Sequence, residues 1–277
     1  MSNSNVRYLV FDIESIADGE LVSKMRYPGE GLNGGQAIAK YREFLLEKYE
    51  SDFIPYTFQI PVSIVVAKVA TDHSLIDLVS LDDGEFRSHV MTQHFWLGWE
   101  KYNQPTLVSF NGRTFDIPLL ELSAYRYGIS LGEWFRFRGK GYEQPRNRFN
   151  VEGHMDLQEI LTNFGASRFN GGLNLAANLI GKPGKIDVQG FMVQDMFDDG
   201  KLKEIDNYCR CDVLDTYFVF LRTLVLIGEI ELSREQELIG QTKEWLIAET
   251  DRHPIYRTYL DAWGDWKSPW DNGEGGN

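Results

Sequence analysis

The chain lacks an apolar run long enough to cross a bilayer, and it has very few cysteines. Its 277 residues include only Cys209 and Cys211, which lie two apart in a stretch that predicts a helix. A spanning helix needs about 20 consecutive apolar residues, and two cysteines this close cannot build a disulfide framework. Residues 1–7 have no signal-peptide character. We therefore expect a soluble protein of the reducing cytoplasm that does not act on membranes.

Basic residues are also scarce. The chain has 28 Lys and Arg against 41 Asp and Glu, which gives a net charge of −13. Affinity for a long duplex comes from Lys and Arg that neutralise phosphates. The composition thus argues against a protein that coats long duplexes by charge attraction. It is compatible with an enzyme that grips only the end of a strand, because bound cations offset negative charge locally.

The apolar runs predict one α/β domain. With 43% hydrophobic residues, the chain is long enough to bury a substantial core. Runs at residues 8–11, 62–69 and 74–80 predict early strands, and helices and strands alternate after them. The Gly-rich residues 17–35 predict a loop. We expect a mixed central sheet flanked by helices. We expect this domain to span residues 1–250 and a partly flexible C-terminal extension to span residues 251–277.

Acidic residues lie against three separated apolar segments. Asp12 and Glu14 end the first predicted strand, Asp116 follows the strand near residue 108, and Asp212 lies in a long helix. Side chains two apart on a strand share one face. Crowded carboxylates repel one another and lose hydration, so a cluster of four is hard to explain unless it binds cations. Oxygen ligands suit Mg²⁺ or Mn²⁺, and paired ions of this kind cleave phosphodiesters.

Each of these signals has an ordinary structural alternative. Asp116 lies two residues before a proline, which also fits a helix N-cap. Tyr208 and Asp212 share a helix face, where a half-buried tyrosine over a solvated aspartate is common. Asp206 and Asp215 are rivals for the ligand role of Asp212. Three weak signals in this order, each on an element that can point to one place, favour a metal site over coincidence.

Residues that contact a substrate are harder to find. Residues 134–148 carry five basic side chains and one acid, interleaved with aromatics. This pattern suits a single strand through phosphate pairing and base stacking, whereas the alternative is a surface loop whose arginines pair with nearby acids. Asp156 is expected to be a helix N-cap or strand-end residue, not a fifth ligand. The candidate substrate contacts are Asn111, Arg113, Arg136, Arg138 and Lys185.

The acidic motifs resemble those of a known family. Asp12-Ile-Glu14, Phe110-Asn-Gly-Arg-Thr-Phe-Asp116 and Tyr208-x-x-x-Asp212 are similar to the three exonuclease motifs of the tyrosine branch of the DEDD superfamily. The histidine branch would place His at position 207, where this chain has Asn207. The closer resemblance, over roughly residues 7–227, is to stand-alone proteins related to the proofreading domain of family B DNA polymerases.

The resemblance implies a ribonuclease H-like (DnaQ-like exonuclease) fold and metal-dependent 3′–5′ hydrolysis of single-stranded or frayed DNA or RNA. Asp12, Glu14 and Asp212 would hold one Mg²⁺ or Mn²⁺ ion. Asp12 and Asp116 would hold a second, and Tyr208 would orient the attacking water. A polymerase or repair complex is the expected class of partner. Two alternatives are a catalytically silent nucleic-acid-binding or scaffold domain and a ribonuclease H-like endonuclease; the complete set of acids favours the exonuclease.

Overall fold

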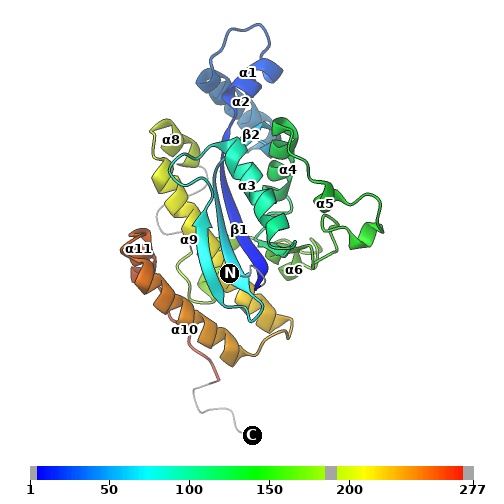
Figure 1. The fold of residues 1–277 in the computed structure, drawn as a ribbon. Coiled ribbons are helices and arrows are strands. Elements are labelled where there is room, and N and C mark those ends of the chain that lie inside the picture. The colour runs from blue at the N-terminus through cyan, green and yellow to red at the C-terminus, as the bar shows by residue number, and fades with distance from the viewer. Residues whose placement is uncertain (1–4, 185–191, 271–277) are drawn as a thin grey trace.

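A five-stranded mixed sheet forms the centre of the molecule (Figure 1). The computed structural model describes residues 5–184 and 192–270. The strands are β1 (Val6–Ala17), β2 (Gln59–Ala70), β3 (Leu75–Ser80), β4 (Thr106–Ser109) and β5 (His154–Asp156). Their order is β3-β2-β1-β4-β5, with β2 antiparallel to β1 and β3, and with β1, β4 and β5 mutually parallel. This topology confirms the expected mixed central sheet of an α/β fold.

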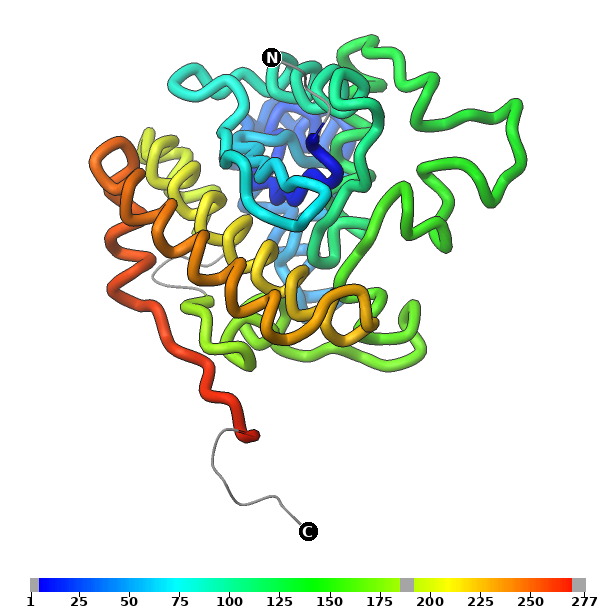
Figure 2. The backbone as a smooth tube through the Cα atoms, turned by 60° about the horizontal axis from the view of Figure 1, so that its bottom comes forward, coloured from blue at the N-terminus to red at the C-terminus, as the bar shows by residue number. Residues whose placement is uncertain are grey.

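Helices cover both faces of this sheet. They are α1 (Gly19–Arg26), α2 (Gly34–Tyr49), α3 (Ser88–Lys101), α4 (Asp116–Tyr127), α5 (Gly132–Phe135), α6 (Leu157–Leu161), α7 (Gly172–Leu179), α8 (Val193–Asp198), α9 (Leu202–Leu226), α10 (Leu232–Glu249) and α11 (Ile255–Asp261), with short 3-10 turns η1 (Tyr56–Phe58) and η2 (Gly141–Glu143). One face packs against α3 and α4, and the other against α9. Figure 2 shows α10 running beside α9. No helix in residues 5–184 or 192–270 combines the length and the apolar character that a bilayer crossing requires.

The alternation of side chains along β1 assigns its residues to the two faces. Leu9, Phe11 and Ile13 belong to the core under α3 and α4, whereas Val10 belongs to the core under α9. Successive strand residues point to opposite faces. Asp12, two residues after Val10, and Glu14 after it are therefore directed to the α9 side. A register irregularity in the β1–β2 pairing follows Glu14 directly.

A small helical unit connects the C-terminal end of β1 to the N-terminal end of β2. The loop prediction for residues 17–35 was wrong over α1, because Asp18 caps this helix by accepting a hydrogen bond from the Leu21 amide. The α1–α2 pair has its own core, which includes Val22. A Cβ atom at Gly19 would lie 2.6 Å from the Gly34 carbonyl oxygen, so the two helices can approach this closely because residue 19 is glycine.

The chain remains tightly packed beyond the expected domain end at residue 250. Tyr256 and Tyr259 on α11 are fully buried in the same core as α9 and α10. Trp263 also packs against this core. The first part of the expected C-terminal extension is thus continuous with the core, and the extension's last seven residues, 271–277, lie outside the described residues.

Candidate active site

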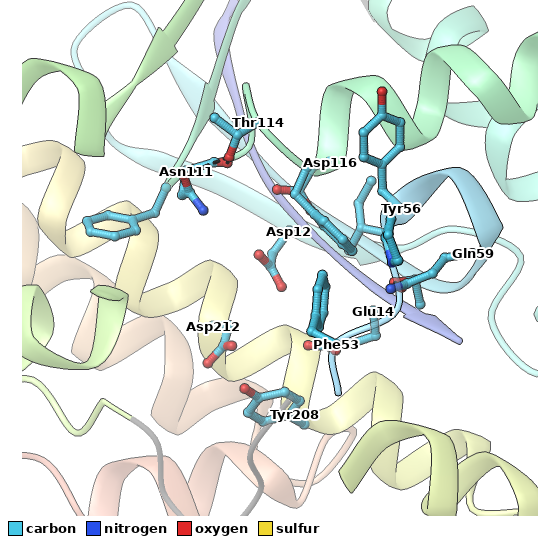
Figure 3. A pocket seen from close by; sticks show the side chains of 15 residues that line it. Asp12, Glu14, Phe53, Tyr56, Gln59, Asn111, Thr114, Asp116, Tyr208 and Asp212 are labelled. Carbon is cyan, nitrogen blue, oxygen red and sulfur yellow. Dashed lines mark hydrogen bonds between the residues drawn. The ribbon is translucent and has the colours of Figure 1, made fainter. Parts of the chain in front are cut away.

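The five residues with predicted catalytic roles line one cavity of about 520 Å³. Three elements supply them: the middle of β1, the start of α4 and the first half of α9 (Figure 3). The residues are Asp12, Glu14, Asp116, Tyr208 and Asp212. Because β1, β4 and β5 are parallel, the loops that leave β4 and β5 lie at the same end of the sheet as the carboxyl-terminal part of β1. Sites in such folds form at this end of the strands.

Asp12 lies in the middle of this acidic group. It is half-buried, and burial raises the pKa of its carboxyl well above the usual range. The charges of Asp116, Glu14 and Asp212 raise this pKa further. Each of these three carboxylates is therefore close enough to Asp12 to disfavour its ionised form. A divalent cation reverses this effect, since it favours the ionised form of every carboxylate around it.

Cys209 also approaches the acids. Its Sγ lies 3.4 Å from the Asp12 carbonyl oxygen, and ligand atoms of Asp12, Glu14 and Cys209 lie within 4.8 Å of one another. Burial raises the pKa of this thiol well above its usual value, with Asp12 as the next cause. A metal ligand must be the thiolate, so this raised pKa disfavours Cys209 as a ligand relative to the carboxylates.

Asp116 is the first residue of α4, not its cap. Phe115 holds the N-cap position without a side-chain hydrogen bond, so the N-cap alternative for Asp116 is wrong. The Asp116 side chain is only 6% exposed, and burial, followed by the charge of Asp156, raises its pKa to about 7. A Cβ atom at Gly112 would lie 2.9 Å from Asp116 Oδ2. Glycine at that position leaves the carboxylate the space that it occupies.

Tyr208 lies one helical turn before Asp212 on α9, with its ring toward the cavity (Figure 3). Burial raises the pKa of the Tyr208 hydroxyl far above its usual value. The charges of Asp212, Glu14 and Asp12 and a hydrogen bond with Asp212 act in the same direction. The phenol is therefore neutral at physiological pH, which suits a hydrogen-bonding group and excludes a general base.

The two rival aspartates on α9 do not line the cavity. Asp206 is fully buried and pairs with Arg210, with its Oδ2 3.0 Å from Arg210 Nε. Asp215 accepts a 2.6 Å hydrogen bond from the Tyr259 hydroxyl. Both carboxylates thus serve internal contacts away from Asp212.

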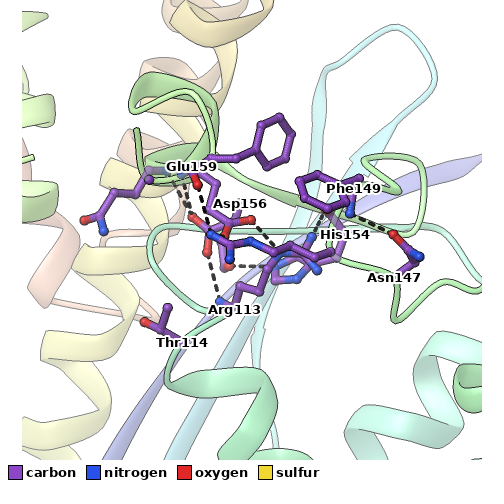
Figure 4. Close-up of polar contacts among 12 residues, drawn as sticks. Arg113, Thr114, Asn147, Phe149, His154, Asp156 and Glu159 are labelled. Carbon is purple, nitrogen blue, oxygen red and sulfur yellow. Dashed lines mark hydrogen bonds and ion pairs between the residues drawn. The ribbon is translucent and has the colours of Figure 1, made fainter. Parts of the chain in front are cut away.

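The loop before α4 is held by Asp156 (Figure 4). Its carboxylate accepts hydrogen bonds from the backbone amides of Asn111 at 3.0 Å and Arg113 at 2.9 Å. The same carboxylate accepts from the Gln158 amide and caps α6, which confirms its expected N-cap role. Asp156 therefore joins the strand end of β5 to the loop that carries Asp116.

Among the candidate substrate contacts, Asn111 lines the cavity and Arg113 does not. Asn111 Oδ1 accepts hydrogen bonds from Gln158 and Thr114, and Figure 3 shows its amide group on the cavity side. The Arg113 guanidinium pairs with Glu159 at 2.8 Å and lies in the network of Figure 4. Its contacts hold the loop in place.

The basic loop at residues 134–148 also lies outside the cavity. It projects away from the sheet in Figure 2. Four of its five basic residues pair with acids, as in the alternative left open from the sequence. The pairs are Arg136–Glu133, Lys140–Glu143, Arg146–Glu121 and Arg148–Glu159. Arg138 is in none of the ion pairs found among the described residues, and Lys185 lies outside the part of the chain that the structure describes.

Four aromatic residues and one proline that were not expected in the site from the sequence also line the cavity. Phe53, Pro55 and Tyr56 come from the segment between α2 and β2, and Phe110 and Phe115 flank the loop after β4. The side chain of Phe53 is 60% exposed. The only signal in the sequence was an aromatic run around a proline, which has neither helix nor strand periodicity.

Comparisons with known proteins identify similar sequences and structures. The family model described as "predicted 3′-5′ exonuclease related to the exonuclease domain of PolB" matches residues 51–263, which is more than half of the chain. A solved family B DNA polymerase from the hyperthermophilic archaeon Pyrobaculum calidifontis matches with 16% sequence identity and a TM-score of 0.48. The match covers 89% of this chain and 29% of that polymerase chain. No curated protein matches.

Proposed function

We propose that this chain, which belongs to the family of predicted 3′–5′ exonucleases related to the exonuclease domain of PolB, uses divalent metal ions to remove nucleotides from the 3′ end of a nucleic acid strand. One observation carries the proposal. Four carboxylates from three elements far apart in the sequence line the same cavity, at the edge of the sheet. Such a group is unfavourable without cations, since its members raise the pKa of Asp12 by their charges.

The donor set fits Mg²⁺ or Mn²⁺. The proposed donors are carboxylate oxygens, and the raised pKa of the nearby Cys209 thiol disfavours it as a ligand. Asp12, Glu14 and Asp212 would hold one ion, and Asp12 with Asp116 a second. When bound, two such ions supply a hydroxide nucleophile and stabilise the departing 3′-oxygen.

The other residues of the cavity position the reactants. The Tyr208 hydroxyl directs the attacking water by a hydrogen bond, because its raised pKa keeps it protonated and so unable to act as the base. The Asn111 amide contacts the terminal nucleotide from the opposite wall. Gly112 and Asp156 act indirectly by keeping Asp116 and its loop in place.

The test is degradation of 5′-labelled single-stranded DNA and RNA of matched sequence, with Mg²⁺, with Mn²⁺ and with EDTA. We expect a metal-dependent ladder of products that shorten from the 3′ end, and Asp212→Ala as the inactive control. Comparing the two ladders assigns the preference for DNA or RNA, which depends on contacts to the 2′-hydroxyl.

Two results would overturn the proposal. If no oligonucleotide is degraded with either metal, the chain is the catalytically silent nucleic-acid-binding or scaffold domain. If a circular single strand is cut, the enzyme is an endonuclease. Both outcomes use the same purified protein and the same buffers.

A further inference from the structure

A second cavity adjoins the candidate active site. Its volume is about 500 Å³, and it shares Ser15, Phe53 and Gln59 with the carboxylate cavity. Its other walls come from the end of β1, from α2 and from α8. The two cavities adjoin along these shared residues, and the second extends toward the α1–α2 unit; we call the two adjoining cavities the groove. Each half has the size of an ordinary small-molecule site.

Hydrogen bonds hold two of the residues that both cavities share, Ser15 and Gln59. The Gln59 amide donates to the Ile54 carbonyl oxygen and accepts from the Ser15 hydroxyl. Farther along, Gln194 Oε1 accepts a 2.9 Å hydrogen bond from the Ala17 amide. The groove is therefore formed before any ligand arrives, because its polar groups are already held in position.

Arg42, on α2, is the basic side chain of the second cavity. It is half-buried, yet within residues 5–184 and 192–270 it takes part in no ion pair or hydrogen bond between side chains. The arginines at 136, 146 and 148 are all paired with acids. Asp52 and Asp195 also line this cavity, but both are exposed, so solvent and salt screen their repulsion of an anion.

Phe53 stands where the two cavities meet. It lines both of them and is 60% exposed. Its ring centroid lies 5.7 Å from that of Phe115. Phe53 and Arg42 line the same cavity, and an aromatic ring together with a basic side chain suits an unpaired base and its phosphate.

We propose that a single-stranded substrate runs from the carboxylate cavity over Phe53 into the second cavity, where Arg42 contacts a backbone phosphate upstream of the scissile bond. This inference rests on the proposed function. Removal of a 3′ nucleotide leaves the rest of the strand bound, so the strand must leave the carboxylates through an open continuation of their cavity. Arg42 precedes residues 51–263, so the family match does not assign this contact.

The experiment measures kcat/KM for single strands of two to six nucleotides. For the wild-type protein, kcat/KM should rise with length until the groove is filled. Phe53→Ala should reduce the ratio of hexamer to dimer kcat/KM roughly 10-fold, since stacking contributes about 1–3 kcal/mol per base. Phe53→Trp, which keeps an aromatic face, should preserve the ratio.

The salt dependence isolates the role of Arg42. Arg42→Gln should reduce the slope of log(kcat/KM) against log[salt] by about 0.7, which is the change expected when the protein neutralises one phosphate fewer on a single strand. Arg42→Lys keeps the charge and should keep the slope. Arg257→Gln is the matched control, because Arg257 is an exposed arginine on α11 and lies outside both cavities.

The failures of the two proposals are distinguishable. If the protein degrades oligonucleotides but Phe53→Ala and Arg42→Gln keep the wild-type length and salt dependence, the path is overturned and the hydrolysis stands. If no oligonucleotide is degraded, anisotropy of a fluorescein-labelled hexamer measures Kd for the same variants. Equal Kd values for all of them would overturn the path independently of catalysis.

Discussion

Asp116→Asn should make the metal-free protein more stable at alkaline pH while it removes activity. Burial and the charge of Asp156 raise the pKa of Asp116 from 3.8 to about 7. At pH 8 the carboxyl is ionised in the folded and the unfolded protein. The rise in pKa then corresponds to a cost in folding stability of about 4 kcal/mol at most. Asparagine has nearly the same shape without the charge, so the variant avoids this cost.

The pH dependence follows from the direction of the shift. Between about pH 4 and pH 7, folded Asp116 keeps a proton that the unfolded chain releases, so the stability of the wild-type protein falls as the pH rises through this range. The variant lacks this contribution. The difference in stability should be small near pH 4 and largest above pH 7. For a chain of this size, 4 kcal/mol corresponds to roughly 8 °C in Tm.

Urea denaturation in EDTA at pH 5 and at pH 8 measures this difference. Repeating it with Mg²⁺ at pH 8 should stabilise the wild-type protein more than the variant, since a ligand that binds only the folded state stabilises it. Asp261→Asn, which changes an exposed carboxyl on α11, is the control and should follow the wild-type curve. A variant that is less stable than the wild type at pH 8 in EDTA, or equally shifted at both pH values, would refute the reasoning.

Three further changes test the site and its support. Asp12→Ala should lower kcat at least about 1000-fold in the oligonucleotide assay, because metal ions contribute several kcal/mol to transition-state stabilisation; near-normal turnover would remove Asp12 from the site. Tyr208→Phe should lower kcat roughly 10- to 100-fold and leave the Mg²⁺-induced rise in Tm unchanged, and loss of that rise would mean that the hydroxyl supports the metals. Asp206→Ala should destabilise the protein by about 3–5 kcal/mol in urea, because buried Arg210 loses its fully buried partner and keeps only the longer 3.5 Å pair with Asp83, and a change below about 1 kcal/mol would contradict this account.

Local patterns accounted for much of the fold. An apolar run that ends in Asp12 and Glu14 fixed both a central strand and the shared face of the two acids, since alternation along a strand is independent of context. The spacing of four residues between Tyr208 and Asp212 likewise placed these two side chains on one face of α9. The prediction of a loop at residues 17–35 rested on their high glycine content and was wrong over α1. There the Asp18 cap and the burial of Val22 stabilise a helix in spite of that composition.

Local sequence patterns did not predict which arginines face a cavity. Arg113 and the basic loop at residues 134–148 have the composition of a nucleic-acid contact, yet most of their charges meet acids such as Glu159 and Glu121. No motif in the sequence pointed to Arg42, which is the basic side chain of the second cavity. Whether an arginine faces a carboxylate or a groove depends on segments distant in the chain, and composition does not contain that information.

The sequence by itself indicated the family through the resemblance of its three acidic motifs. Short-range periodicity and residue chemistry indicated the central strand and the four acids and one tyrosine proposed for the site. Only the tertiary structure decided that the acids share a cavity with Phe53, that Asp206 and Asp215 face elsewhere, and that a groove continues past the acids toward α2. These features are set by packing between β1, α2, α4 and α9. Such packing joins residues that no local pattern connects.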